Sequence, residues 1–517
     1  MREPARVEER IVVLDFGSQY TQLIARRIRK LSVYCEIVPF DAPVNSMEDE
    51  SIRGLVMSGG PSSVYEKNSP LPDKRIFEIG KPIMGICYGM QVIAHLLGAK
   101  VAATGRREYG RAKLHVDKRG GLFKGLPQTI QVWMSHGDRV SEIPSGFERL
   151  GHSVNSHYAA IGDLKRNIYG LQFHPEVMHT PGGGEIIKNF LFGICGCRGG
   201  WTPKSFVRSS VESIKEQVGS GKVICALSGG VDSAVTAALI HKAIGNQLTC
   251  IFVNNGLLRK GEVEEVLGTF KRKLKLNVRY VDDEKDFLTR LRSVTDPEEK
   301  RRIIGQRFIM VFEREAKELG KVDFLAQGTL YPDRIESRSV KGPSSTIKTH
   351  HNVGGLPELM KLKLLEPLKD LFKDEVRDVG RELGLPDAIV RRQPFPGPGL
   401  AVRAVGEVTK ERLEVLREAD AIFLEELEMA NLNSEVSQAF AVLLPVKSVG
   451  VMGDGRTYRN VVALRAVATE DYMTADWFRI PHDVLGRIST RIINEVDSVN
   501  RVVYDISTKP PATIEWE

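Results

Sequence analysis

Short apolar runs that end in small or polar residues recur along the first part of the chain. Ile11–Leu14, Gly54–Met57 and Pro82–Ile86 are such runs, and they predict strands buried on both faces. The amphipathic stretches 20–31 and 90–97 follow two of these runs and predict helices. Strands that alternate with helices predict a mostly parallel α/β sheet. Such sheets bind ligands at the carboxyl ends of their strands, so the residues after each run are functional candidates.

The same alternation resumes after residues 198–203, where Gly and Pro cluster between two patterned regions. Ser205–Val218 predicts a helix, and residues 234–240 predict another. Four further apolar runs predict buried strands: Val223–Leu227, Leu248–Val253, Val278–Val281 and Phe324–Gln327. These elements predict a second doubly wound α/β domain.

The last part of the chain opens with the Pro/Gly-rich hinge 394–399. Its patterns predict helices over 408–429 and 483–496 and strands over 440–444, 461–467 and 501–504. The predicted fold is therefore two doubly wound, mostly parallel α/β domains, residues 1–200 and 201–393, followed by a small α+β domain, residues 394–517.

Composition narrows the function classes only modestly. A chain of 517 residues supports about three or four domains. The net charge of +7 is spread along the chain, so we expect anionic small-molecule substrates and no nucleic-acid partner. No apolar run approaches the roughly 20 residues that span a bilayer, and we expect no membrane association. The charged N-terminal segment lacks a signal-peptide core and the six cysteines are scattered, which favours the cytoplasm.

A glycine-rich turn joins the strand at Val223 to the following helix. Its sequence is Ser-Gly-Gly-Val-Asp-Ser, residues 228–233. The free backbone N–H groups and the positive dipole end of the helix suit a phosphate, and the glycines allow its close approach. The serine hydroxyls add donors, and Asp232 is placed to orient the loop or to hold a metal ion. The predicted ATP-binding residues are Ser228, Gly229, Gly230, Val231, Asp232 and Ser233.

This turn is not the G-x-x-x-x-G-K-[ST] loop, because the nearest match, residues 219–222, lacks the first glycine and is followed by valine. The S-G-G-x-D-S pattern instead resembles the loop of ATP pyrophosphatases, a family that cleaves ATP between its α- and β-phosphates.

Cys87 lies between Gly85 and Gly89 where a predicted strand meets a helix. This is the pattern of a nucleophile elbow, and the helix N-terminus favours the thiolate. His174 and Glu176 are a candidate base and orienting carboxylate, provided that the chain bends at the intervening proline. The backbone N–H groups of Gly59 and Gly60, at another strand end, are candidate oxyanion donors.

The patterns G-x-C-x-G-x-Q and H-P-E resemble class I glutamine amidotransferases. That resemblance implies that Cys87 attacks the amide of glutamine, with His174 as proton carrier and Glu176 as its orienting group, and that ammonia is released. The implied glutamine-binding residues are Gly59, Gly60, Gln91, Ser135, His136 and Asp138, with Asp138 suited to the α-ammonium group. The alternative for residues 134–138 is a polar turn after a strand at 130–132.

An amidotransferase joined to an ATP pyrophosphatase resembles the GMP synthetase family, and further matching stretches extend this resemblance over essentially the whole chain. It implies that ATP adenylates XMP on its C2 oxygen and that ammonia then displaces AMP to give GMP. It also implies Mg²⁺ on the ATP phosphates, with protein ligands that the sequence leaves unassigned, and a homodimer formed through the third domain.

The same resemblance implies a set of XMP-binding residues: Arg301, Gln438, Asp454, Lys509 and Glu515. Lys509 suits the phosphate and Glu515 the purine N–H groups. Lys300 and Arg302 are alternatives to Arg301, because they flank it.

Four questions stay open at this point. The basic residues of the polar stretch 331–355 form either a lid over the substrates or a solvated loop; they are Arg334, Arg338, Lys341, Lys348, His350 and His351. The pair Cys195 and Cys197 suggests a metal site, but no second pair completes one. The alternative functions are an NAD synthetase-like adenylating ligase and a non-catalytic nucleotide sensor.

Overall fold

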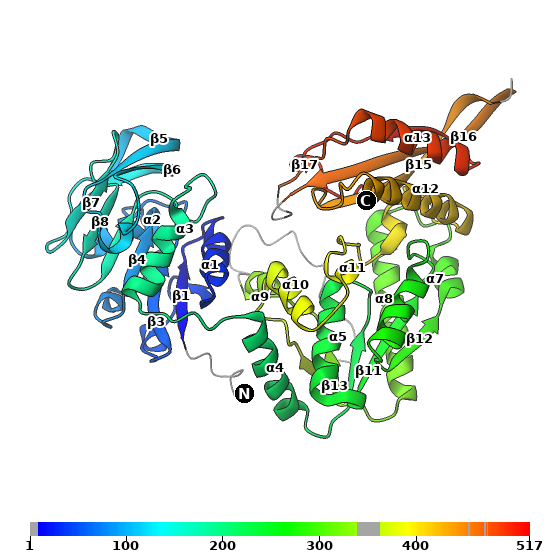
Figure 1. The fold of residues 1–517 in the computed structure, drawn as a ribbon, viewed down its shortest axis with the longest axis horizontal. Coiled ribbons are helices and arrows are strands. Elements are labelled where there is room, and N and C mark those ends of the chain that lie inside the picture. Colours follow the sequence, from blue (N-terminus) through cyan, green and yellow to red (C-terminus); the bar gives the residue numbers. More distant parts are fainter. Residues whose placement is uncertain (1–8, 339–361, 453–454, 470–471, 473) are drawn as a thin grey trace. The chain divides into compact units, whose positions relative to one another are not determined.

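A computed structural model describes residues 9–338, 362–452, 455–469, 472 and 474–517 (Figure 1). Their contacts divide the chain between Ser209 and Ser210 into two units. The predicted boundary after residue 200 lies near this division, and that after residue 393 lies within the second unit. The three predicted domain limits themselves stay predictions.

The first unit is built on a nine-stranded sheet in the order β2-β1-β3-β4-β9-β8-β7-β5-β6. Its first five strands are parallel, which confirms the α/β prediction. Strands β1, β3 and β4 are buried over most of their length because each carries an apolar run named in the sequence analysis. Strand β9 is also buried, whereas β2 is buried only at its start, and neither was predicted as a strand. Their bounds are β2 Tyr34–Pro39, β1 Arg10–Asp15, β3 Ile52–Met57, β4 Ile83–Ile86 and β9 Ile168–Leu171.

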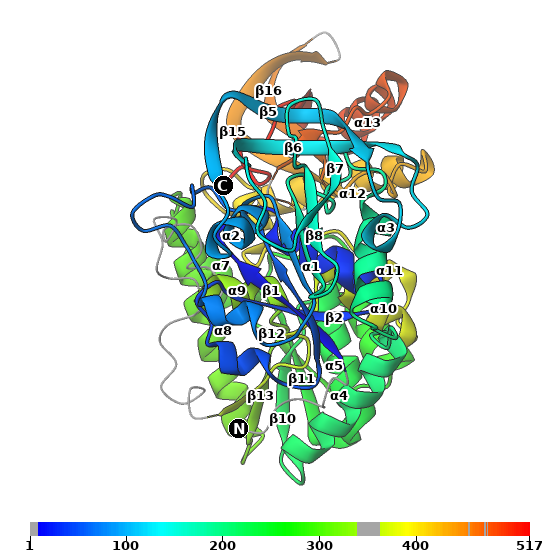
Figure 2. The same cartoon turned by 90° about the vertical axis from the view of Figure 1, so that its left-hand side faces the viewer.

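The other four strands of this sheet are antiparallel, and most of this half was not predicted. Figure 2 shows two of them, β5 and β6, as long neighbouring strands. Buried and exposed residues alternate along β6, so no continuous apolar run marks it. The bounds are β8 Ala160–Asp163, β7 Glu148–His152, β5 Val101–Val116 and β6 Thr129–Val140.

Helices cover both faces of the parallel half. Helix α2 (Tyr88–Leu96) lies so close to β4 that a Cβ on Gly85 would be 2.5 Å from the backbone of Gly89. Helices α1 (Thr21–Lys30) and α3 (Gly183–Lys188) contact each other. They lie on the opposite face, where the next turn after α3 packs on Gly54 through Cys195.

The second unit contains a five-stranded parallel sheet in the order β12-β11-β10-β13-β14. The strand pattern predicted the first four of these strands, and β14 was not predicted. The strands are β12 Val278–Asp282, β11 Leu248–Asn254, β10 Val223–Ala226, β13 Phe324–Ala326 and β14 Lys363–Leu365. The helices of this region are α4 Pro203–Val218, α5 Val231–Ile244, α6 Glu262–Leu267, α7 Glu284–Leu291, α8 Pro297–Glu318, α9 Tyr331–Arg338, α10 Lys373–Glu382 and α11 Asp387–Val390.

Helix α9 corrects one prediction, because the polar stretch from residue 331 was expected to be a loop. Tyr331 is buried, and the centroid of its ring lies 5.3 Å from that of Phe372. Tertiary packing therefore fixes the start of α9. The rest of the stretch, 339–361, lies outside the described residues.

The last part of the chain forms a four-stranded sheet with two helices, in agreement with the α+β prediction (Figure 1). Helix α12 packs on β15 and on α13, and their apolar side chains share one core with residues such as Leu257 and Ile304 of the preceding region. Strands β15 and β16 extend beyond the predicted ranges as an antiparallel pair. The bounds are α12 Lys410–Met429, α13 His482–Glu495, β15 Gln438–Met452, β16 Gly455–Ala468, β17 Asp476–Trp477 and β18 Val499–Tyr504.

Within the described ranges, no helix combines the length and the apolar character that crossing a bilayer requires.

Candidate active sites

Cys87 is the first residue after β4 and the N-cap of α2, and its backbone is strained. Its φ of 54° and ψ of −104° lie in a region that L-residues rarely adopt. The turn is compressed on both sides, since a Cβ on Gly89 would lie 2.5 Å from the Met57 carbonyl oxygen. The Cys87 amide donates to the Leu171 carbonyl at 2.6 Å. These contacts confirm an elbow at the predicted position.

His174 and Glu176 meet although they are only two residues apart, so the chain does turn at Pro175. The His174 Nδ1 lies 2.7 Å from the Glu176 Oε1, and both residues are buried. The Thr180 hydroxyl donates to the His174 carbonyl at 2.7 Å, and the Tyr20 ring packs edge-on against the imidazole at 5.1 Å. The imidazole is therefore held in one orientation.

The charge state of His174 follows from its neighbours. Burial lowers the pKa of its imidazole, but the Glu176 carboxylate and a hydrogen bond with the Cys87 side chain outweigh burial, and the pKa is raised well above 6.5. Gln172 also points its Nε2 at the Cys87 Sγ, 3.9 Å away. A thiol beside a histidine that favours the imidazolium form is suited to nucleophilic attack.

Among the predicted glutamine-binding residues, Ser135 contacts Cys87, and Gln91 and His136 contact Asp138. The Cys87 thiol donates to the Ser135 carbonyl at 3.6 Å. The Asp138 carbonyl lies 3.0 Å from both the Gln91 Nε2 and the His136 Nδ1. Residues 134–138 thus lie inside a strand, and the alternative of a polar turn after 130–132 is wrong.

Two further groups belong to this region. The Asp138 carboxylate accepts hydrogen bonds from the Ser63 hydroxyl and from the Tyr65 hydroxyl, the latter at 2.7 Å. A Cβ on Gly59 would be 3.3 Å from the His174 Cε1, so Gly59 lies against the imidazole, and Gly60 is the next residue.

The turn 228–233 has the conformation expected of an anion-binding loop. Gly229 has a φ of +76°, and Gly230 is the N-cap of α5. The hydroxyl oxygens of Ser228 and Ser233 lie 3.0 Å apart, and the Ser233 hydroxyl contacts the Gly230 carbonyl at 3.0 Å. The loop therefore keeps its shape through its own side chains and leaves the first turn of α5 to receive a ligand.

Two basic residues that the sequence analysis missed contact this loop. The Lys373 ammonium, at the start of α10, lies 2.5 Å from the Asp232 Oδ2. The Arg392 guanidinium donates to the Gly229 carbonyl at 2.8 Å. The other carboxylate oxygen of Asp232, Oδ1, is buried and has no hydrogen-bond partner among the described residues. It is a candidate ligand for a cation.

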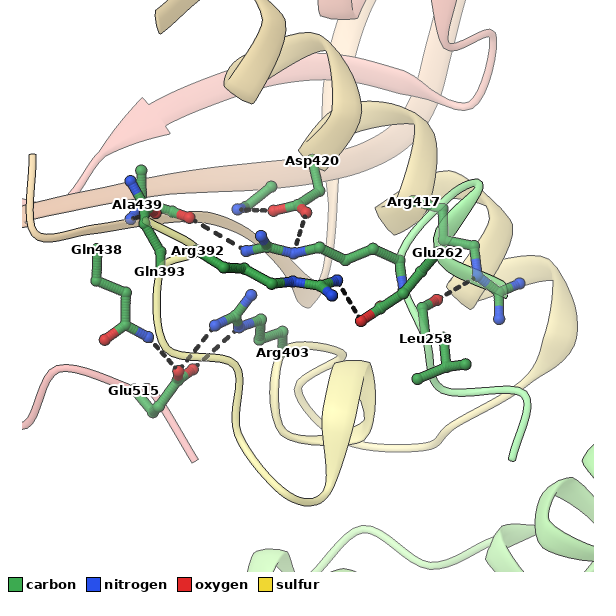
Figure 3. Close-up of polar contacts among 12 residues, drawn as sticks. Leu258, Glu262, Arg392, Gln393, Arg403, Arg417, Asp420, Gln438, Ala439 and Glu515 are labelled. Atoms are coloured by element: carbon green, nitrogen blue, oxygen red, sulfur yellow. Dashed lines mark hydrogen bonds and ion pairs between the residues drawn. The ribbon is translucent and has the colours of Figure 1, made fainter. Parts of the chain in front are cut away.

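A second polar cluster surrounds Glu515 near the C-terminus (Figure 3). The Gln438 Nε2 donates to the Glu515 Oε1 at 2.8 Å, so two predicted XMP residues are neighbours. Arg403, fully buried and missed in the sequence, holds both oxygens of Glu515 at 2.9 and 3.1 Å. Arg301 donates to the Glu517 carbonyl at 2.6 Å, whereas its alternative Lys300 is fully buried and paired with the Glu517 carboxylate.

The remaining candidates do not join this cluster. The Lys509 ammonium donates to the Tyr472 carbonyl at 2.8 Å, and Asp454 lies outside the described residues. Of the six basic residues of the predicted lid, Arg334 alone has a described side chain, and it is paired with Asp370 at 2.6 Å. The side chains of Arg338, Lys341, Lys348, His350 and His351 lie outside the described set.

The two cysteines at 195 and 197 are both buried, and burial raises the pKa of the Cys197 thiol to about 12. No group of three or more His, Cys, Asp or Glu side chains in the described part of the chain is arranged to hold a metal ion. These cysteines are therefore not part of such a protein-only site.

Comparisons with known proteins cover the whole chain. Residues 12–194 match the family model of class-I glutamine amidotransferases, residues 221–275 match the tRNA methyl transferase HUP domain, and residues 425–516 match the GMP synthase C-terminal domain. The chain is 59% identical to a glutamine-hydrolysing GMP synthase of Caldicellulosiruptor saccharolyticus and 58% identical to one of Aquifex aeolicus. In both cases the match covers 98% of this chain and 99% of the relative.

Among solved structures, a putative GMP synthase component from Thermoplasma acidophilum is 35% identical over 37% of this chain and 96% of its own, with a TM-score of 0.34.

Proposed function

The chain belongs to the family of glutamine-hydrolysing GMP synthases, and from this premise we propose how its residues divide the synthesis of GMP between two sites. Glutamine is hydrolysed to ammonia in the first unit, and XMP is adenylated and aminated in the second. The observation that carries this division is that one chain holds both the Cys87–His174–Glu176 constellation and the intact loop 228–233. Membership of this family sets aside the NAD synthetase-like ligase and the non-catalytic sensor.

In the first site, the Cys87 thiolate attacks the side-chain amide carbon of glutamine. The oxyanion that forms is stabilised by the backbone N–H groups of Gly59 and Gly60. His174 donates its proton to the nitrogen as the C–N bond breaks, which releases ammonia and leaves a glutamyl thioester on Cys87. The same imidazole then takes a proton from the water that hydrolyses the thioester, while Glu176 keeps its orientation.

The remaining first-site residues hold the amino-acid end of glutamine. Asp138 pairs with the α-ammonium group, for which it exchanges its contacts with Ser63 and Tyr65. Gln91 and His136 keep the backbone at Asp138 in place through its carbonyl oxygen, and the backbone at Ser135 borders the reacting thiol.

In the second site, the N–H groups of the loop 228–233 hold the two terminal phosphates of ATP, and Lys373 adds positive charge beside them. The Asp232 Oδ1, which is buried and has no hydrogen-bond partner in the described part of the chain, suits Mg²⁺, because this hard cation prefers carboxylate oxygens and shares its other positions with phosphates and water. When bound, Mg²⁺ neutralises charge on the phosphates.

XMP lies with its purine N–H groups at Glu515, which Arg403 and Gln438 hold in place. Its C2 oxygen attacks the α-phosphorus of ATP, and pyrophosphate leaves. Ammonia then adds to C2, and AMP leaves with the former C2 oxygen. Arg301, Lys509 and Asp454 complete the proposed XMP contacts.

The direct test is the product spectrum. We expect equal amounts of GMP, AMP and pyrophosphate when the protein is incubated with ATP, Mg²⁺, XMP and glutamine. Formation of ADP, or AMP release that does not depend on XMP, would contradict the proposed function.

The Glu176→Gln variant tests the role of the carboxylate beside His174. Because the carboxylate raises the pKa of the imidazole, its loss lowers that pKa, and the imidazolium is then lost at lower pH. We expect the alkaline limb of kcat/KM for glutamine to move down by about one to three pH units. Ammonium-dependent GMP formation is the internal control. An alkaline limb at the same pH as in the unaltered protein would refute this role.

We also propose a cytoplasmic homodimer. The β15–β16 strands expose a group of apolar side chains that suits burial against a second copy; they are Val446, Val449, Val451 and Tyr458. We expect light scattering to give a mass twice that of the 57.6 kDa chain, and Val451→Lys together with Tyr458→Lys to give a monomer. A monomer before substitution would exclude the proposal.

A further inference from the structure

Two successive residues, Arg392 and Gln393, reach in different directions from the segment between α11 and the 394–399 hinge. Arg392 contacts the phosphate loop through the Gly229 carbonyl, and Gln393 contacts Ala439 near the start of β15. Figure 3 shows the contacts of Arg392 with Glu262 and of Gln393 with Ala439. Neither residue has a role in the chemistry described above.

The Arg392 side chain is fixed on both sides of its guanidinium. One nitrogen donates to the Gly229 carbonyl at 2.8 Å, and another pairs with the Glu262 carboxylate. The Glu262 side chain is only 1% exposed, so this ion pair is shielded from water. A Cβ on Gly229 would lie 2.8 Å from the Arg392 Nη1, so the guanidinium packs closely against this glycine. The positive φ of Gly229 is a second feature that favours glycine at this position.

Gln393 contacts the chain beside the Gln438–Glu515 pair, which is the proposed purine contact. Its Oε1 accepts a hydrogen bond from the Ala439 amide at 2.8 Å, and its Nε2 lies 3.4 Å from the Val436 carbonyl. Between these two contacts along the chain lies Gln438, whose side chain donates to Glu515. The phosphate loop and the proposed purine contact are therefore joined through two adjacent side chains.

A second connection runs in parallel. The second carboxylate oxygen of Glu262, which is not the one paired with Arg392, accepts a hydrogen bond from the Arg259 amide at 2.8 Å. The Arg259 guanidinium donates to the Ala439 carbonyl at 3.3 Å. The Arg259 Nε also lies 3.1 Å from Asp420, whose other oxygen accepts from the Ala441 amide at 2.9 Å. Both backbone groups of Ala439 are thus tied to residues that connect to the phosphate loop.

We propose that Arg392 and Gln393 are positioning residues that hold the phosphate loop in register with the Gln438–Glu515 pair, so that the α-phosphate of ATP meets the acceptor oxygen of XMP. This inference rests on the proposed function of those two sites. The loop binds phosphates with its own N–H groups, so its displacement reduces kcat more than it weakens ATP binding. A misplacement of about 1 Å is enough to cost about 100-fold in rate.

The first variant is Arg392→Lys. Lysine keeps the charge that neutralises Glu262, but it lacks the planar fork that serves Glu262 and Gly229 together. We expect kcat for ammonium-dependent GMP formation to fall about 30- to 100-fold, with KM for ATP and for XMP changed less than about threefold. The matched control is Arg391→Lys, since the Arg391 side chain is 68% exposed and pairs across its own helix end with Asp387. Its kcat should stay within about twofold.

The second variant is Gln393→Met, which leaves the Arg392–Glu262 pair in place and removes the contacts of Gln393 to Val436 and Ala439. We expect the same loss of kcat with a melting temperature within about 4 °C of the unaltered protein. If Arg392→Lys does not fold, Gln393→Met decides alone. A kcat within about threefold of the unaltered protein in a folded variant overturns the proposal, as does a loss confined to KM. Failure of the proposed function is distinct, because the unaltered protein would then make no GMP.

Discussion

We expect the replacement of Cys87 by alanine to abolish GMP formation from glutamine and to leave GMP formation from ammonium. In the proposed mechanism the Cys87 sulfur bonds to the glutamine carbon, and removal of such a nucleophile costs about 10⁴-fold or more. Externally added ammonium bypasses this step, because XMP adenylation uses residues of the other unit. The measurement is the GMP rate with saturating glutamine and, separately, with ammonium.

Cys35→Ala is a matched control for this variant. Cys35 is also a buried thiol of the first unit, on β2, and its Sγ donates to the Ala25 carbonyl at 3.4 Å. We expect both rates to stay within about twofold in this control. If Cys87→Ala lost both activities together, the division into two sites would be wrong.

We expect the replacement of Asp232 by alanine to remove activity with both nitrogen sources. Adenylation precedes amination, so a damaged ATP site stops the reaction whichever way ammonia arrives. The substitution removes the partner of Lys373 and the unpartnered oxygen assigned to the cation. Loss of one such preorganised charge lowers kcat by about 10²- to 10³-fold.

One further variant and one control make the Asp232 experiment more specific. Asp232→Asn keeps the shape and removes the charge, so an equal loss there assigns the effect to charge. Asp378→Ala is the control, because Asp378 is exposed and paired with Arg381 on α10. Ammonium-dependent activity that survives in Asp232→Ala would contradict the assignment of the loop.

The parts of both sites that lie at strand ends were predictable from the sequence. Cys87 sits between two glycines that the close packing of β4 on α2 requires, and Gly229 adopts the left-handed backbone that glycine favours. Here the local backbone geometry dictates the residue type, so a short pattern carries the information. The bend at Pro175 was likewise expected from the need to bring His174 and Glu176 together.

The residues that were missed act over long sequence separations. Lys373 contacts a residue 141 positions away, Arg392 one 163 positions away and Arg403 one 112 positions away. From the sequence alone, a basic residue that contacts a site cannot be distinguished from one on the solvated surface, because its partner is determined by the tertiary fold. The antiparallel half of the first sheet was missed for local reasons, since β6 alternates buried and exposed residues without a continuous apolar run and β8 is only four residues long.

The central claim is that ATP is cleaved at its α-phosphate by the C2 oxygen of XMP. XMP labelled with ¹⁸O at C2 tests it in a single turnover with ammonium, followed by mass spectrometry of all phosphate-containing products. We predict one ¹⁸O atom in each AMP and none in pyrophosphate. Unlabelled AMP, or label in inorganic phosphate, would contradict the account.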